Sequence, residues 1–123
     1  MKPKDREKTA RKAAKLGLNG SGRTLWICAD RGTAKCCSSD AMRHSVKALK
    51  KHCRELRKQH SIEVRVFATK CLDICHGGPL VAVMPDGIWY GGCTPEILDR
   101  IVQEHLIDGR PVADHIIARP SDR

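Results

Sequence analysis

Residues 24–68 carry the pattern that most restricts the fold of this chain. A short apolar run at 24–29 is typical of a buried strand. From 40 to 60, apolar side chains recur every three or four positions, which predicts an amphipathic helix. Residues 62–68 alternate between apolar and other side chains, which predicts a second strand. A right-handed crossover between two parallel strands accounts for this order, so the pattern predicts an α/β fold.

The second half of the chain predicts a hairpin followed by a helix. Residues 80–84 are an apolar strand, 85–87 spell Pro-Asp-Gly and 88–90 form the return strand. Thr94 is expected to cap a second helix, whose apolar stripe is Ile97, Leu98, Ile101, Val102 and Leu106. The predicted order β-α-β-β-β-α describes a small mixed sheet with helices packed on it.

The length of 123 residues suits one compact domain. Residues 1–22 hold seven Lys and Arg against two acidic residues and end in a Gly-rich stretch. Their alanines favour helix, but the apolar face is too thin to hold a helix against a core. We therefore expect a basic flexible tail and linker at 1–22, the folded domain at 23–118 and a short C-terminal tail at 119–123.

The chain has no stretch that predicts a membrane span or a secretory signal. Its longest apolar run, 80–84, is far shorter than the roughly 20 residues that cross a bilayer. The first residues are charged, with no apolar stretch behind them. We expect a cytoplasmic protein, in which thiols stay reduced and clustered cysteines indicate metal binding or catalysis before disulfides.

Four or five of the seven cysteines are predicted to converge. Cys28 ends the first strand, Cys36 and Cys37 precede the helix, and Cys71 and Cys75 lie between the second and third strands. The ends of parallel strands and the loops beside them share one edge of the sheet. Four thiolates there suit either zinc or a [2Fe-2S] cluster. The eight residues between the first and third of these cysteines are unusual for structural zinc, so spacing weakly favours iron and leaves zinc open.

The second half of the sequence resembles a known family. The residues that carry the resemblance are Cys71-x3-Cys75-x2-Gly78-Pro79, then Pro85-Asp86-Gly87-Ile88-Trp89-Tyr90, Thr94-Pro95-Glu96 and Gly109-Arg110-Pro111-Val112. They occur in the order found in thioredoxin-like [2Fe-2S] ferredoxins, also called Shethna-type ferredoxins. The resemblance covers about residues 24–117 and is weaker in the first half.

The resemblance implies a thioredoxin-like fold, one [2Fe-2S] cluster per chain and often a homodimer. It matches Cys28 to the first ligand and Cys71 and Cys75 to the last two. The second ligand is Cys37 or Cys36, and Cys37 is preferred because it aligns the following helix better. A protein of this kind carries one electron at a time between redox proteins, so the chain is expected to be a carrier and not an enzyme.

The remaining cysteines and histidines have simpler interpretations. Cys53 lies on the apolar stripe of the first helix and is expected to be a buried small hydrophobe. Cys93 is interpreted as a passive loop residue, although a thiol at a helix start can be reactive. His76 could replace a cysteine ligand, but four cysteines suffice. His44, His52, His60, His105 and His115 are interpreted as solvated or terminal residues.

The formal charge of +9, from 23 basic and 14 acidic residues, suggests an anionic partner. More than half of the excess lies in residues 1–22, and the first helix is also basic. Aromatic residues, which stack on single-stranded nucleic acid, number four. We expect an acidic redox partner and regard nucleic acid as unlikely. The competing hypotheses are a zinc-stabilised basic module that binds nucleic acid or an acidic protein, and a thiol oxidoreductase that uses Cys36 and Cys37 or Cys93.

Overall fold

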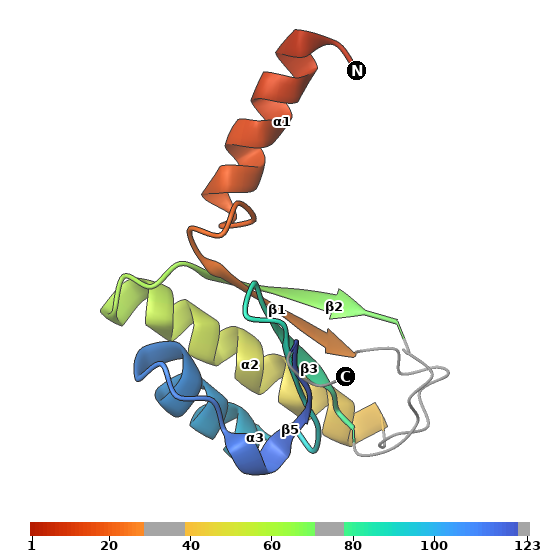
Figure 1. Cartoon of the computed structure of the whole chain (residues 1–123). Coiled ribbons are helices and arrows are strands. Elements are labelled where there is room, and N and C mark those ends of the chain that lie inside the picture. Colours follow the sequence, from red (N-terminus) through yellow and green to blue (C-terminus); the bar gives the residue numbers. More distant parts are fainter. Residues whose placement is uncertain (29–38, 71–77, 121–123) are drawn as a thin grey trace.

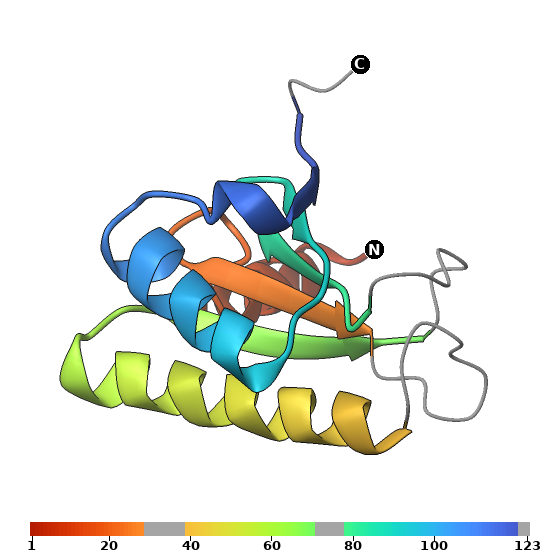
Figure 2. The same ribbon diagram turned by 90° about the horizontal axis from the view of Figure 1, so that it is seen from below.

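The computed structural model describes residues 1–28, 39–70 and 78–120. They form a five-stranded mixed sheet, with α2 and α3 in contact with each other on one side of it (Figures 1 and 2). In chain order the elements are α1 (Pro3–Lys15), β1 (Arg23–Cys28), α2 (Ser39–Gln59), β2 (Val64–Thr69), β3 (Val81–Met84), β4 (Ile88–Tyr90), α3 (Pro95–Arg100), η1 (Ile101–Ile107), η2 (Ala113–His115) and β5 (Ile116–Ala118).

The sheet has the strand order β2-β1-β3-β4-β5. β1 is parallel to β2 and antiparallel to β3, and β3, β4 and β5 continue antiparallel. The predicted fold class and the predicted succession from β1 to α3 are therefore confirmed. β5 is an addition that the sequence does not predict, because it has three residues, of which Ile117 and Ala118 are exposed.

Helix α2 packs on the sheet through the apolar stripe that its sequence predicts. Met42, Leu49, Cys53 and Leu56 are all at most 2% exposed. Leu49, Cys53 and Leu56 join the main core with residues of β1, β2 and β3. The core also includes residues of α3 and η1, which together form the C-terminal helix. Full burial of one leucine contributes about 1.5–3 kcal/mol, so this stripe fixes the helix over the sheet.

The predicted second helix is present, but it changes its geometry midway. The Thr94 side chain caps it by accepting a hydrogen bond from the Ile97 N–H, at 3.4 Å. After the α-helical turns of α3, the chain continues as the wider π-helix η1. The predicted stripe is buried at Leu98, Ile101, Val102 and Leu106.

The basic N-terminal segment forms helix α1, which projects from the sheet (Figure 1). Alanine and lysine favour helix, and Pro3 occupies the first turn, where its missing N–H is tolerated. No residue of α1 is buried. This agrees with the thin apolar face seen in the sequence, and the domain boundary at residue 23 stays a prediction. None of the helices in the described parts of the chain is long and apolar enough to cross a membrane.

Candidate metal centre

Three chain segments that border the predicted cysteine ligands meet at one edge of the sheet. Cys28 is the last residue of β1 and lies opposite Thr69, the last residue of β2. The Cys28 N–H donates a hydrogen bond to the Leu80 carbonyl oxygen, at 3.1 Å, where the chain enters β3. The parallel pairing of β1 and β2 therefore brings the ends of two strands and the start of a third to one place, as the sequence predicts.

The start of α2 lies at the same edge. Met42, in the first turns of α2, packs with Cys28 and Leu80 in a small buried cluster that is separate from the main core. Cys28 is 1% exposed. A buried thiol at this position is a soft donor that fits either iron or zinc, and the apolar side chains around it exclude water.

The other predicted ligands lie outside the described residues. Cys36, Cys37, Cys71 and Cys75 fall in the segments 29–38 and 71–77, as do His76 and Gly77. In sequence, Cys37 precedes α2 by two residues and Cys71 follows β2 by two residues, while Cys75 is three residues before Gly78. All four candidate ligands thus border elements that meet at this edge. Among the described residues, no group of three or more His, Cys, Asp and Glu side chains could hold a metal ion.

The chain that leaves residues 71–77 is anchored to the start of α3. The Cys93 N–H donates to the Pro79 carbonyl oxygen, at 3.0 Å, and the Ser45 hydroxyl of α2 donates to the Cys93 carbonyl oxygen, at 2.8 Å. Pro79, Ser45 and Cys93 are all buried. These bonds tie the strand β3, the helix α2 and the C-terminal helix together beside Cys28.

Two further cysteines are structural. Burial raises the pKa of the Cys53 thiol to about 11 and that of the Cys93 thiol to about 12. Both are at most 1% exposed. At physiological pH these groups are neutral thiols, and the thiolate is the nucleophilic form. The interpretation of Cys53 as a buried hydrophobe is confirmed, and the passive interpretation of Cys93 is favoured over a redox role.

A buried polar network starts at the opposite end of the sheet, at Arg23 and Asp86, and runs through His105 to Tyr90. The Tyr90 hydroxyl accepts from the Val112 N–H, at 3.1 Å, and is 2.8 Å from His105 Nδ1. His105 Nε2 lies 2.7 Å from Asp86 Oδ2, and Arg23 Nε donates to the same carboxylate. Because the hydroxyl already accepts one bond, it best donates its proton to Nδ1, which leaves Nε2–H to donate to Asp86.

This network corrects one sequence prediction. The sequence predicts a solvated His105, yet this residue is 1% exposed. Its position seven residues after Leu98 and four after Ile101 places it on the buried stripe of the helix, a signal that the polarity of histidine obscures. Among the described residues, no buried side-chain nitrogen or oxygen lacks a hydrogen-bond partner, so the network is fully satisfied.

The network also sets the charge state of Asp86. Burial by itself raises the pKa of this carboxyl, but hydrogen bonds from His105 and Arg23 and the positive charge of Arg23 outweigh it. The net effect is a pKa below the usual range for aspartate. The carboxylate is therefore ionised at neutral pH and holds the β3–β4 turn to the start of β1 and to the C-terminal helix.

Comparison with curated proteins identifies several similar sequences, although no family model matches the chain. A 2Fe-2S ferredoxin of Aquifex aeolicus is 47% identical over 54 residues, which are 44% of this chain and 49% of that protein. A 2Fe-2S ferredoxin of Clostridium pasteurianum is 44% identical over 52 residues, 42% of this chain and 51% of the relative. A putative 2Fe-2S ferredoxin of Priestia megaterium is 28% identical over 81% of this chain and 73% of its own length. The chain thus spans about half the length of the first two relatives.

Solved structures agree with these relatives over more of the chain. A thioredoxin-like [2Fe-2S] ferredoxin from Aquifex aeolicus superposes with a TM-score of 0.70 and 28% identity, covering 81% of this chain and 94% of that one. The wild-type form in another crystal structure gives a TM-score of 0.65 with 29% identity, over 80% and 99% of the two chains. Two further structures of that protein carry serine in place of cysteine, at positions four residues apart. In sequence and in fold, this chain resembles the thioredoxin-like [2Fe-2S] ferredoxins.

Proposed function

We propose that this protein is a [2Fe-2S] ferredoxin, an electron carrier between redox proteins, with one cluster per chain. One observation carries the proposal. The elements that border Cys28, Cys37, Cys71 and Cys75 meet at a single edge of the sheet, and Cys28 is buried there between Met42 and Leu80. The names of the similar proteins, all 2Fe-2S ferredoxins, support the same conclusion.

The proposed ligands are Cys28, Cys37, Cys71 and Cys75. Thiolate sulfur suits iron in a [2Fe-2S] cluster, which supplies a centre that gains or loses one electron when it is bound. The four-residue separation of Cys71 and Cys75 equals the separation of the two cysteines that were changed to serine in the Aquifex protein. The similar protein thus has a pair of cysteines with the same spacing as the last two proposed ligands.

The chain's own residues prepare this edge for an anionic group. Met42 and Leu80 exclude water from the thiol of Cys28. Helix α2 starts beside them, and the start of a helix carries a partial positive charge that favours nearby thiolates. An electron carrier needs no general base and no substrate pocket, so we propose a role in electron transfer and not in catalysis.

Metal analysis with a visible absorption spectrum tests the proposal. We expect a coloured protein with about two iron atoms and two sulfides per chain. A colourless protein that holds stoichiometric zinc and no iron would contradict the proposal. That result would support the alternative, a zinc-stabilised basic module that binds nucleic acid or an acidic protein.

A pair of variants tests the choice between the two adjacent cysteines. Cys37→Ser is expected to lose iron or to shift the visible spectrum, because one of the four ligands is replaced. Cys36→Ser is the matched control and is expected to keep the wild-type iron content. The opposite pattern would assign the second ligand to Cys36.

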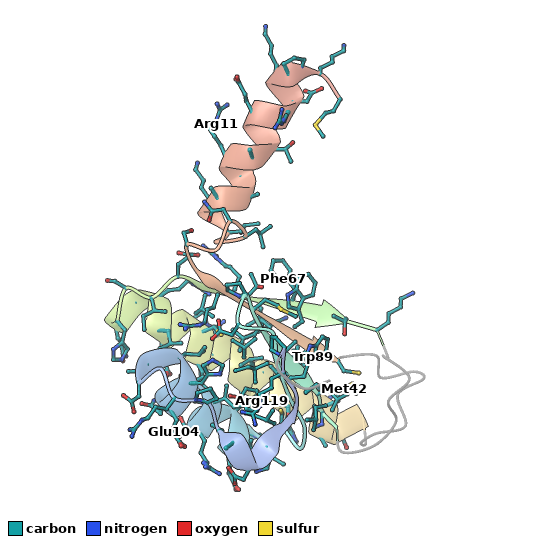
Figure 3. All side chains as sticks on the ribbon, viewed as in Figure 1. Arg11, Met42, Phe67, Trp89, Glu104 and Arg119 are labelled. Atoms are coloured by element: carbon teal, nitrogen blue, oxygen red, sulfur yellow. The ribbon has the colours of Figure 1, made fainter. Side chains whose placement is uncertain are left out.

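We also propose that the protein acts in the cytoplasm, with acidic redox proteins as partners, and forms a homodimer. The sheet face away from the main core carries a row of apolar residues, in which Phe67, Trp26, Ala82 and Trp89 lie side by side on β2, β1, β3 and β4. The rings of Trp26 and Phe67 stack with centroids 4.8 Å apart. Figure 3 shows Phe67 and Trp89 on this part of the sheet. A second copy is the proposed occupant of this face.

Light scattering on the purified protein tests the dimer. We expect twice the chain mass for the wild type and a monomer for Trp26→Glu, since a carboxylate would be buried in the apolar row. Lys47→Glu on α2 is the control and should leave the mass unchanged. A wild-type monomer at micromolar concentration would contradict this proposal without affecting the proposed cluster.

A further inference from the structure

We infer that the basic face of helix α2 is the docking surface for an acidic redox partner, an inference that rests on the proposed function. Seven Lys and Arg residues occur between positions 43 and 58 of this helix, with Glu55 as the acidic residue of that stretch. At about 100° per residue they fall within an arc of about 120°. They form what we call the α2 stripe: Arg43, Lys47, Lys50, Lys51, Arg54, Arg57 and Lys58.

Most of the positive charges of the α2 stripe have no ion-pair partner among the described residues. In the described parts of the chain, Lys47, Lys50, Lys51, Arg54 and Lys58 form no ion pair, and all five are exposed. Arg43 pairs with Asp40, at 3.1 Å, near the start of the helix. Such a concentration of one sign of charge raises the local concentration of an oppositely charged partner and speeds its association.

A groove runs beside the stripe between α2 and the edge strand β2. It has a volume of about 230 Å³ and is lined by Lys50, Cys53, Arg54, Arg57, Arg65 and Val66. Arg65 is neutralised by Glu63, at 2.8 Å, and Arg57 donates to the Val64 carbonyl oxygen, at 2.7 Å. Lys50 and Arg54 keep their donors for a ligand, so the groove can receive a carboxylate side chain of a partner.

The position of the stripe fits a role in electron transfer. Arg43 follows Met42, which packs against Cys28 at the edge where we propose the cluster. An acidic protein that lies along the stripe would thus bring its own redox centre to that edge. The stripe therefore starts at the proposed cluster, and Lys50 and Arg54 lie about 12 Å and about 18 Å further along the helix than Met42.

Helix α1 is also basic but differently placed. It leads into Arg23 at the other end of β1, and the six residues of this strand separate the two ends by about 16 Å. Arg11 on α1 and Met42 on α2 lie far apart (Figure 3). A partner held by α1 alone would therefore be kept away from the proposed cluster.

These observations favour an acidic protein over nucleic acid. The stripe begins at the cysteine edge, which a partner's redox centre must approach for electron exchange, whereas binding of a phosphate backbone does not require that edge. The stacked aromatic pair, Trp26 and Phe67, lies on the sheet, and neither residue lines the groove. Stacking platforms beside the cations are typical of single-stranded nucleic-acid sites and are missing from the described groove residues.

Calorimetric titration of the holo-protein with poly-L-glutamate tests the inference. At low ionic strength, the double variant Lys50→Glu and Arg54→Glu should weaken binding at least tenfold. The matched control, Lys8→Glu and Arg11→Glu on α1, makes the same change in net charge and should weaken binding less than threefold. Raising the salt concentration should remove most of the difference, because surface charges are screened.

Three results would overturn the inference. These are equal weakening by the two double variants, a larger effect of the α1 variant, and tighter binding of a short duplex DNA than of poly-L-glutamate at equal ionic strength. Should the charge-reversed α2 variant unfold, Lys50→Gln and Arg54→Gln give the same comparison with a smaller change. The visible spectrum of each sample separates the two proposals: a cluster without α2-dependent binding refutes docking alone, whereas absence of the cluster refutes the proposed function.

Discussion

The two ends of the sheet are built from different chemistry. At the end where β1 and β2 finish, Cys28 lies in a small apolar cluster with Met42 and Leu80. At the other end, Arg23 and Asp86 begin a continuous hydrogen-bonded network that runs through a buried histidine to Tyr90. The network is satisfied within the described residues, whereas the cysteine end presents a soft donor suited to a metal.

Residues that stabilise the fold and residues of the proposed site therefore occur at different positions of one strand, and their effects can be measured separately. β1 contributes Arg23 to the network at its first residue and Cys28 to the proposed site at its last residue. A change at the network end should lower the stability of the fold and leave the ligands in place. A change at the cysteine end should remove the cluster and leave the network intact.

The largest expected effect is the loss of the cluster at the cysteine end. Cys28→Ser should remove most of the iron, because a hydroxyl is a poor replacement for a thiolate ligand. Cys53→Ala is the matched control, since Cys53 is equally buried but lies outside the proposed ligand set. Iron content per chain measures both. Equal loss of iron in the two variants would show that general destabilisation, and not ligation, explains the result.

The next effect is expected in the polar network that starts at Arg23 and Asp86. Tyr90→Phe removes the hydroxyl that accepts from the Val112 N–H and bonds to His105. Two buried polar groups lose their partner, which should lower the free energy of unfolding by about 2 kcal/mol. Chemical denaturation measures this loss, and the visible spectrum of the folded variant should be unchanged. A variant that loses its iron while remaining folded would show that the network and the proposed cluster site are not independent.

A pH dependence should follow from Asp86. Its pKa is lowered in the folded protein, so its contribution to stability is complete above the pKa of the unfolded chain, about 4, and is lost as pH falls through the lower folded value. Asp86→Asn should therefore flatten the stability curve below about pH 4. Thermal unfolding across this range checks the result. An unchanged curve would show that Asp86 does not cause the pH dependence of stability.

The smallest effect is expected for removal of residues 1–19. Helix α1 has no buried residues and joins the molecule beside the network end. Its loss should change the free energy of unfolding by less than about 0.5 kcal/mol, the range of surface changes that break no packing. Denaturation of the shortened chain measures the change. A loss of several kcal/mol would mean that α1 packs against the domain in solution.

The elements that the sequence predicts best are those with a long or strict pattern. The apolar face of helix α2 repeats with a regular helical period. Leu49 and Leu56 on this face are fully or almost fully buried. The paired ends at Cys28 and Thr69 follow from the parallel crossover, which places both at the same edge. Here local pattern and topology agree, so the sequence alone is enough to place residues that are far apart along the chain next to each other.

The features that the sequence does not predict depend on tertiary contacts. β5 has too few residues for a pattern and is defined by its pairing with Trp89 and Tyr90 of β4. The sequence predicts a solvated His105 because a lone histidine gives no signal of the Tyr90 and Asp86 side chains that satisfy it. The choice between Cys37 and Cys36 concerns adjacent positions outside the described residues, so it stays a prediction.

Electron paramagnetic resonance of the reduced protein tests the central claim most directly. The holo-protein, purified without oxygen and reduced chemically, should give a low-temperature signal that integrates to about one spin per chain, as expected for a [2Fe-2S] cluster that has accepted one electron. The signal should be absent before reduction and absent from Cys28→Ser. A spectrum that stays silent on reduction, from a protein that contains zinc in place of iron, would contradict the account.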